Sequence, residues 1–463
     1  MKNQLFRKKS LDQLLNTKGK VQLDKTLSGF DLITLGVGAV VGTGIFILPG
    51  TVAALHTGPA IVFSFIMAAI VCGFCALCYS EFSSSIPVAG SAYTYSYVVF
   101  GELIAWVIGW CLILEYGLAV AAVATGWSAY FQSLISGFGI HIPEALSGPF
   151  DPANGTYINL PAIVIILLLA AFLTLGVKES NRLNGIMVFI KVGIVLLFII
   201  VGVFYVKPEN WQPFAPYGFE GILSGAALVI FAYLGFDAVS SAAEEVKNPQ
   251  RNMPIGIIGT LVICTLLYVA VSLVLTGMVP YTELNVGNPV AFAMELVNQD
   301  WVFGIISLGA VVSMMTVVFV MLYSGTRLVF SFSRDGMLPK MLSDIHPRRK
   351  VPLKSTWIFS FVISIFAGFI PIDRLAELVN IGTLIAFAAV SIGVIFLRKI
   401  NHPGLQKGFK VPLFPVVPII SFILCIFMIS QLSTFTMIAC LIWIIVGLIV
   451  YFTYGKNHSL LNK

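Results

Sequence analysis

The sequence predicts an all-α polytopic membrane protein with twelve transmembrane helices and essentially one domain. Of the 463 residues, 58% are hydrophobic and only 10% are charged, and the mean hydropathy is +0.96. A soluble globular protein would need far more polar surface. Apolar segments of about 20 residues, the length that crosses a bilayer, recur along nearly the whole chain. Most of the sequence is therefore expected to lie in a lipid bilayer.

The twelve apolar segments follow one another from residue 30 to residue 454. The third and the eighth are longer than a bilayer requires, which favours tilted helices. The spans are expected at residues 30–55, 60–82, 101–134, 160–177, 184–206, 219–244, 254–278, 299–332, 355–371, 375–398, 413–431 and 434–454.

The positions of the basic residues predict the orientation. If the N-terminus is cytoplasmic, only Lys207 and Arg374 of the 27 Lys and Arg residues fall outside, and Lys191 falls inside a span. Because cytoplasmic loops carry the excess of Lys and Arg, both termini are expected in the cytoplasm. The protein is expected in the plasma membrane of the cell. The net charge of +6 thus reflects topology. Without a basic surface interleaved with aromatic residues, no nucleic-acid partner is expected.

Two spans contain residues that interrupt a helix. In the first span, GAVVGTGIF contains Gly38, Gly42 and Gly44, and in the sixth, FAYLGFDA contains Gly235 and Asp237. Unpaired backbone is costly in hydrocarbon, so a broken helix survives only where it lines a polar cavity. Packing of small residues between helices is the alternative explanation, and Gly38 with Gly42 fits a GxxxG pattern.

The paired breaks predict the domain organisation. Spans one and six are five apart, so they cross in opposite directions, as in an inverted repeat of five plus five helices with two terminal helices. Residues 1–29 are expected to form a cytoplasmic segment and residues 30–398 the core. The two repeats would cover about 30–206 and 219–398, and residues 399–463 would supply the last two helices and a cytoplasmic C-terminus.

The breaks also predict a ligand. Amides freed at Gly42 and Gly44, at the start of the second half-helix of span one, suit a carboxylate because the positive end of the helix dipole is there. Backbone carbonyls freed at the breaks suit an ammonium group. They are expected from Val40, Val41, Phe231, Ala232 and Leu234. Such a site complements an α-amino acid zwitterion without any charged side chain.

Lys191, Glu115 and Asp237 are ionisable residues deep within predicted spans. Lys191 is expected to mark an ion or proton path, donating to freed carbonyls when it is protonated; a lysine that snorkels to the interface is the alternative. Glu115 either contributes to the site or makes structural hydrogen bonds. Asp237 either gates the path or caps the helix that follows the second break.

The motifs resemble the amino acid–polyamine–organocation transporter superfamily, most closely its cationic amino acid transporter branch in bacterial form. They are GAVVGTGIF at 38–46, GFDAVSSAAEEVKNPQRNMP at 235–254 and SGTRLVFSFSRDGMLPK at 324–340. The resemblance implies the LeuT-type inverted-repeat fold, a substrate site at the breaks of spans one and six, and coupling to protons rather than sodium, with Lys191 matching the lysine of span five in that branch.

The resemblance also assigns residues to the site. Thr43 and Gly44 would bind the substrate carboxylate, and Glu115 matches the acidic residue of span three. The carbonyls for the amino group would come from Val40, Phe231, Ala232 and Leu234. Met321 would line the side-chain pocket, and its bulk predicts small or medium neutral amino acids despite the name of the branch.

Other functions have less support in the sequence. An amino acid exchanger, a cationic amino acid transporter and a membrane amino acid sensor without transport activity remain alternatives. An enzyme is not expected, because HExxH, GxSxG and P-loop motifs are missing, and no repeated filter motif indicates a channel. The run Cys72, Cys75 and Cys78 is expected to pack between helices rather than hold a metal. The expected partners are an amino acid and the bilayer, with the proton as coupling ion and no cofactor; protein partners are not specified.

Overall fold

The computed structural model describes residues 7–8, 25–86, 91–175, 181–347, 349, 351–400, 405 and 408–460. These residues form helices and connecting loops, with no β-strand among them. The helices are α3 (Gly29–Val40), α4 (Thr43–Phe46), α5 (Leu48–Val52), α6 (Ile61–Ser85), α7 (Ser91–Val99), α8 (Glu102–Ser136), α9 (Leu160–Thr174), α10 (Asn181–Gly202), α11 (Gly218–Val229), α12 (Pro249–Met278), α13 (Pro289–Leu296), α14 (Asp300–Arg334), α15 (Leu353–Phe369), α16 (Ile372–Leu397), α17 (Val416–Ser430), α18 (Thr434–Val450) and α19 (Lys456–His458).

The helices coincide with the predicted apolar segments. Within the described part of the chain, seven are long and apolar enough to cross a membrane, judged by length and composition. Five shorter apolar helices occupy the remaining predicted ranges. The all-helical class is thus confirmed, whereas twelve membrane crossings and the inverted repeat stay predictions.

Two short helices between predicted spans were not expected from the sequence. α7 follows the second predicted span, and α13 lies in the predicted outer loop after the seventh. Both are too short for a helical pattern of apolar residues to stand out, because α7 has nine residues and α13 has eight. Packing of α7 on α8 and of α13 on α14 supplies the support that short helices lack in isolation.

Side chains cap the first turns of several helices. At the start of α3, the Ser28 hydroxyl accepts the Asp31 amide at 3.3 Å while the Asp31 carboxylate accepts the Ser28 amide at 2.8 Å. The Asn159 side chain accepts the Ala162 amide at 3.2 Å at the start of α9. These bonds satisfy amides that have no acceptor within the helix.

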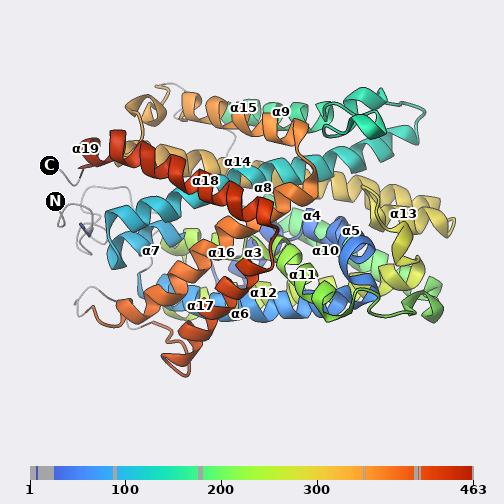
Figure 1. Ribbon diagram of the computed structural model, residues 1–463, viewed down its shortest axis with the longest axis horizontal. Helices are drawn as coiled ribbons and strands as arrows, with labels where there is room; N and C mark the ends of the chain where they lie inside the picture. Colours follow the sequence, from blue (N-terminus) through green and yellow to red (C-terminus); the bar gives the residue numbers. More distant parts are fainter. Residues whose placement is uncertain are drawn as a thin grey trace.

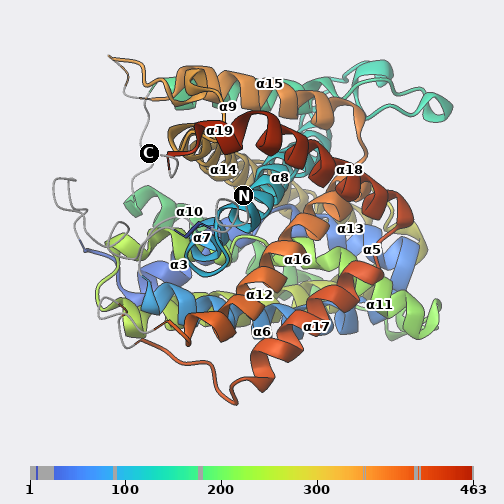
Figure 2. The ribbon, with the colours of Figure 1, turned by 60° about the vertical axis from the view of Figure 1, so that its left-hand side comes forward.

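Long helices run side by side through the molecule. α8 and α14 pack along each other, α16 lies between α8 and α17, and α15 packs on α9 at one side (Figures 1 and 2). The interrupted helix α3 packs on α12 through glycines: a Cβ on Gly36 would lie 2.1 Å from Thr260 Oγ1, so a larger residue would separate the two helices. Packing between helices, which was the alternative explanation for Gly38, therefore applies to Gly36 of span one.

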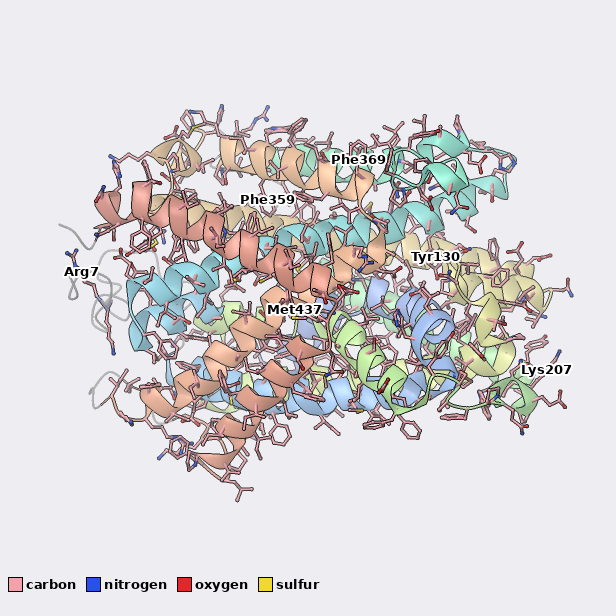
Figure 3. The ribbon with its side chains drawn as sticks, in the orientation of Figure 1. Arg7, Tyr130, Lys207, Phe359, Phe369 and Met437 are labelled. Atoms are coloured by element: carbon pink, nitrogen blue, oxygen red, sulfur yellow. The ribbon has the colours of Figure 1, made fainter. Side chains whose placement is uncertain are left out.

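Two basic residues that are predicted on opposite sides of the membrane lie far apart in the structure. Arg7, predicted to be cytoplasmic, and Lys207, predicted to be outside, lie at opposite ends of the molecule (Figure 3). Large apolar side chains cover the outward faces of the peripheral helices between the two ends. Examples are Phe189, Leu266, Phe361, Ile423 and Leu441. An exposed apolar belt of this extent is typical of a surface in contact with lipid.

Candidate functional site

The first predicted span is broken at Val41 and Gly42. α3 ends at Val40, Val41 is extended with φ −75° and ψ 98°, and Gly42 has φ −156° and ψ −132°. The amides of Ile45 and Phe46 already donate to the Gly42 carbonyl, at 3.1 and 3.3 Å. The helix therefore resumes at Thr43, so the break is shorter than the predicted 42–44.

The sixth predicted span is broken at Leu234 and Gly235. α11 passes into a 3-10 turn at Ile230–Tyr233, Leu234 is extended with ψ 135°, and a 3-10 helix resumes at Asp237–Glu245. Gly235 has φ +112°, a conformation that side chains with a Cβ rarely adopt. The prediction of two interrupted spans is confirmed.

The two breaks touch each other. A Cβ on Gly44 would lie 2.6 Å from Ala232 Cα, and a Cβ on Gly235 would lie 3.0 Å from Ala39 Cβ. Each glycine therefore lets the backbone of the other span approach where no larger residue would fit. This contact, made across almost 200 residues of sequence, is what creates a single site from two breaks.

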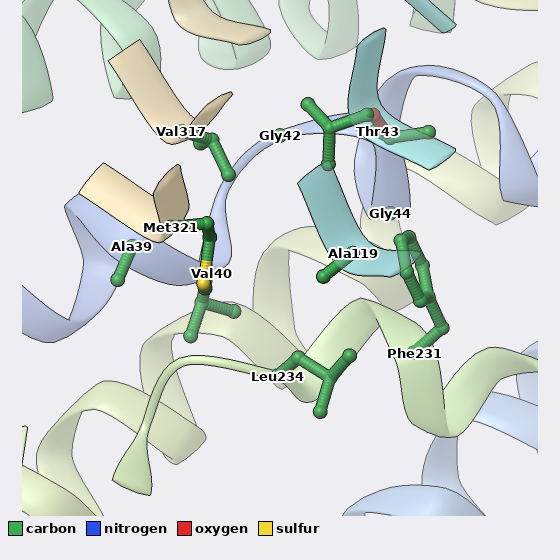
Figure 4. A pocket seen from close by; sticks show the side chains of 11 residues that line it. Ala39, Val40, Gly42, Thr43, Gly44, Ala119, Phe231, Leu234, Val317 and Met321 are labelled. Carbon is green, nitrogen blue, oxygen red and sulfur yellow. The ribbon is translucent and has the colours of Figure 1, made fainter. Parts of the chain in front are cut away.

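A small cavity lies where the breaks meet. Its lining comes from both breaks and from α8 and α14, and its volume of about 20 Å³ holds about one water molecule (Figure 4). Binding anything larger requires the lining to separate. The residues that line it are Ala39, Val40, Gly42, Thr43, Gly44, Ala119, Val123, Phe231, Leu234, Val317 and Met321.

The structure thus brings together seven of the predicted substrate residues. Val40, Gly42, Thr43, Gly44, Phe231, Leu234 and Met321 all line the cavity. Ala232 does not, because it faces Gly44 behind the cavity wall. Glu115 is also missing from the lining.

Polar groups at the first break lack partners on the protein. Among the described residues, no backbone carbonyl accepts a hydrogen bond from the amides of Gly42, Thr43 and Gly44. The Thr43 hydroxyl is also without a partner there, although the side chain is only 1% exposed. Buried donors of this kind, at a helix start, are suited to an anionic oxygen.

The carbonyls are more occupied than the sequence predicts. The Tyr268 hydroxyl lies 3.2 Å from the Val40 carbonyl oxygen and 2.5 Å from that of Ala232. Ser313 donates to the Val41 carbonyl at 3.2 Å. The expectation that these carbonyls are free was therefore wrong, although a carbonyl oxygen with two lone pairs can accept a second donor.

Sequence reasoning missed the residues that hold the breaks. Tyr268 and Ser313 lie 228 and 272 residues from the carbonyls of span one to which they bond. Asn380 donates to the carbonyls of Ala227 and Leu228, both at 2.9 Å, where α11 begins to change its winding. The only sequence signal for these residues is that each is a polar residue within an apolar span. That signal does not show which carbonyl the residue binds.

Lys191 reaches the backbone of span one. Its side chain is 3% exposed, and its Nζ donates to the Gly38 carbonyl at 2.9 Å. The structure therefore does not support a lysine that snorkels to the interface. It also gives Gly38 a role beyond packing, because its carbonyl is the acceptor.

Glu115 and Asp237 are buried away from the cavity lining. Glu115 on α8 faces α16, where a Cβ on Gly382 would lie 3.6 Å from the Glu115 Cβ. One of its carboxylate oxygens, Oε2, has no hydrogen-bond partner within the described part of the chain. Asp237 is the first residue of the 3-10 helix, and the N-cap is Phe236 without a side-chain cap. Asp237 therefore does not occupy the N-cap position, and the choice between the gate and the cap stays open.

Known proteins resemble this chain along nearly its whole length. Residues 27–454 match a family model described as amino acid permease. A methylthioribose transporter of Bacillus subtilis (strain 168) is 56% identical over 99% of both chains. The branched-chain amino acid permease BcaP of the same organism is 50% identical over the full length of both chains.

More distant relatives include eukaryotic proteins. The vacuolar cationic amino acid transporter 4 of Arabidopsis thaliana is 38% identical over 87% of this chain and 68% of its own length. All three relatives are transporters or permeases by name, and the similarity of each covers at least 87% of this chain.

Proposed function

This chain belongs to the amino acid permease family, and from that premise we propose that it imports small or medium neutral L-amino acids together with protons by alternating access. Its family and relatives make it a multi-pass membrane transporter and not an enzyme. The proposal concerns the substrate, the coupling ion and the mechanism.

The observation that carries the proposal is the chemistry of the cavity lining. Its polar groups are backbone groups and the Thr43 hydroxyl, and its side chains are otherwise apolar, with no ionisable residue among them. Unpaired amides suit the carboxylate of an amino acid, and carbonyls across the cavity suit its ammonium group. The side chain of the substrate would meet Ala119, Val317 and Met321, which favours a neutral, apolar group over a cationic one.

Proton coupling is proposed from Lys191. A protonated amine donates to the Gly38 carbonyl, whereas a neutral amine binds it less strongly. Loss of the proton would therefore loosen α3 from α10 next to the site. This arrangement supports a proton as coupling ion, because the strength of the bond between Lys191 and the Gly38 carbonyl depends on whether the amine carries a proton.

The topology completes the proposal. We infer twelve crossings, a LeuT-type repeat of residues 30–206 and 219–398, and cytoplasmic termini in the plasma membrane. Support comes from the two broken spans, five apart in the predicted order, and from the positions of Arg7 and Lys207 at opposite ends.

An uptake panel in proteoliposomes tests the function. Radiolabelled leucine, valine, alanine, serine, threonine and arginine are offered with and without an inward proton gradient, in the absence of sodium. We expect concentrative uptake of the neutral amino acids that depends on the gradient. Arginine as the best substrate, or uptake that needs sodium, contradicts the proposal.

Met321 offers a sharper version of the same test. Met321→Ser removes a bulky thioether from the cavity lining and should admit larger side chains, so the substrate range widens. Leu103→Ser on α8, a partly buried residue away from the lining, is the control. An unchanged range in the Met321 variant would show that this side chain does not limit substrate size.

Methylthioribose is a second candidate substrate, because one relative at 56% identity is a methylthioribose transporter. A methylthio group is small and apolar, so the same pocket would accept it, but it brings no carboxylate for the amides of Gly42 to Gly44. Adding labelled methylthioribose to the panel decides between the two: competition by leucine but no uptake of leucine would favour methylthioribose. Exchange, cationic amino acid transport and sensing without transport are the remaining alternatives, and the panel with preloaded and empty vesicles separates them.

A further inference from the structure

One hydroxyl group reaches both breaks at once. Tyr268 lies on α12 and is fully buried, and its Oη is within hydrogen-bond distance of the carbonyl oxygens of Val40 and Ala232. Val40 ends the first half of span one, and Ala232 belongs to the turn before the second break. Tyr268 is therefore a side chain that joins the two interrupted spans from behind the cavity.

The aromatic ring of Tyr268 is held in place. Its centroid is 5.2 Å from that of Phe65 and 5.3 Å from that of Tyr233, so the hydroxyl has little freedom to leave the carbonyls. A phenol has one proton and can donate to only one of the two acceptors at a time. The other carbonyl then stays in range without a donor from Tyr268 and can accept one from elsewhere.

Under the proposed function, the ammonium group of the substrate supplies such donors. It carries three protons and would bond to carbonyls at the same breaks from the cavity side. Carbonyls without donors are costly in a dry interior, and the cost is greatest while the two breaks move between outward and inward arrangements. In a loaded carrier the ammonium group of the substrate donates to these carbonyls. In an unloaded carrier only groups of the protein can supply the donors.

We propose that Tyr268 is a positioning residue whose hydroxyl joins the two breaks when no ammonium group does so, which allows the carrier to return across the membrane without substrate. The inference rests on the proposed function and adds to it a residue for the return step. It predicts that Tyr268 matters for net uptake, which needs the unloaded return, but not for exchange, in which the carrier is loaded in both directions.

Tyr268→Phe tests this, because it keeps the ring and removes the hydroxyl. Tyr233→Phe is the matched control: Tyr233 is buried in the same aromatic cluster, and its hydroxyl donates to the Phe65 carbonyl at 3.0 Å rather than to a break. We expect Tyr268→Phe to lower net uptake into empty vesicles by about tenfold, the effect of leaving a buried carbonyl unpaired, while exchange into preloaded vesicles changes less than about twofold. Tyr233→Phe should leave the ratio of uptake to exchange unchanged.

Several results would overturn the inference. A merely structural role would lower uptake and exchange in equal proportion, and a role in substrate contact would raise the KM for exchange. No change in either assay, or the same change in both tyrosine variants, also contradicts it. So does a wild-type protein that exchanges but shows no net uptake, because the proposed return step would then not occur.

A measurement without substrate separates this inference from the proposed function. Amide hydrogen exchange in the purified protein should be faster at residues 40–46, a segment that does not contain the control position, in Tyr268→Phe than in Tyr233→Phe. If the uptake panel fails but this difference is seen, the hydroxyl bridge stands and the substrate assignment is wrong. If substrate is transported but hydrogen exchange is the same in both variants, the bridge is wrong and the proposed function stands.

Discussion

At the scale of single residues, the site depends on the absence of a side chain at Gly44. A Cβ there would lie 2.6 Å from the backbone of Ala232, closer than a Cβ normally approaches another heavy atom. The contact fixes the spacing between the amides of span one and the carbonyls of span six. Small changes at this point should therefore affect function more than changes at other glycines.

Gly44→Ala is expected to abolish uptake and to destabilise the protein by roughly 1–3 kcal/mol, because the added methyl group forces two backbones apart. Uptake in proteoliposomes and thermal unfolding in detergent measure the two effects. Gly193→Ala is the control, since a Cβ at Gly193 in α10 would meet nothing within 4 Å. Equal uptake by the two variants would mean that the close approach of the breaks is not needed.

Lys191 is the second residue-scale determinant. Lys191→Ala removes the bond to the Gly38 carbonyl, and we expect it to abolish concentrative uptake and the dependence of the rate on pH. Uptake measured between pH 5.5 and 8 tests this, with exchange in preloaded vesicles as a control for folding. Concentrative uptake with an unchanged pH profile would show that Lys191 is not the coupling group.

At the scale of elements, neighbouring helices hold the interrupted helices at their breaks. Backbone groups that a continuous helix would pair internally are paired here by side chains from α12, α14 and α16. Asn380 of α16 is fully buried and donates to two carbonyls near the end of α11. Such bonds replace helical hydrogen bonds at the break, as a low-dielectric interior requires.

Asn380→Leu is expected to lower the free energy of unfolding by about 2 kcal/mol, since the carbonyls lose a buried donor while the number and branching of the side-chain heavy atoms are kept. Ser360→Ala on α15 is the control: its hydroxyl donates at 2.7 Å to a carbonyl of its own helix, Thr356, which keeps its helical donor. Thermal unfolding of the Asn380→Leu and Ser360→Ala variants compares their stabilities. If Ser360→Ala lowers stability as much as Asn380→Leu, the side-chain bond at the break has no special importance.

At the scale of the whole molecule, a partly buried ion pair connects the core to the segment that leads to the last two long helices. Arg398, at the end of α16, forms two bonds of 2.7 Å with the Glu81 carboxylate on α6. Glu81 also accepts the Val411 amide at 2.6 Å, and the guanidinium lies 3.9 Å from the centre of the Phe414 ring. The chain before α17 is thereby attached to α6.

Arg398→Ala leaves the Glu81 carboxylate without its charged partner, and the Glu81 side chain is only 4% exposed. We expect a loss of about 2 kcal/mol, less than for a fully buried pair because Arg398 itself is partly exposed. Protease cleavage between residues 408 and 416 should also become faster. Lys354→Ala breaks an ion pair whose two side chains are more than half exposed, and should change neither measurement. Equal effects of both substitutions would contradict this role of the pair.

The sequence by itself determined the helical class, the positions of the apolar segments and the two that are broken. These follow from composition and from local backbone preferences, which are properties of neighbouring residues. It also identified most of the residues that line the cavity, because glycines within a span reveal a break and the family resemblance added Met321. The partners of the breaks, Tyr268, Ser313 and Asn380, and the burial of Glu115 against α16 were decided by the tertiary structure. A carbonyl freed by a break accepts whichever donor the fold brings to it, and that donor lies far away along the chain.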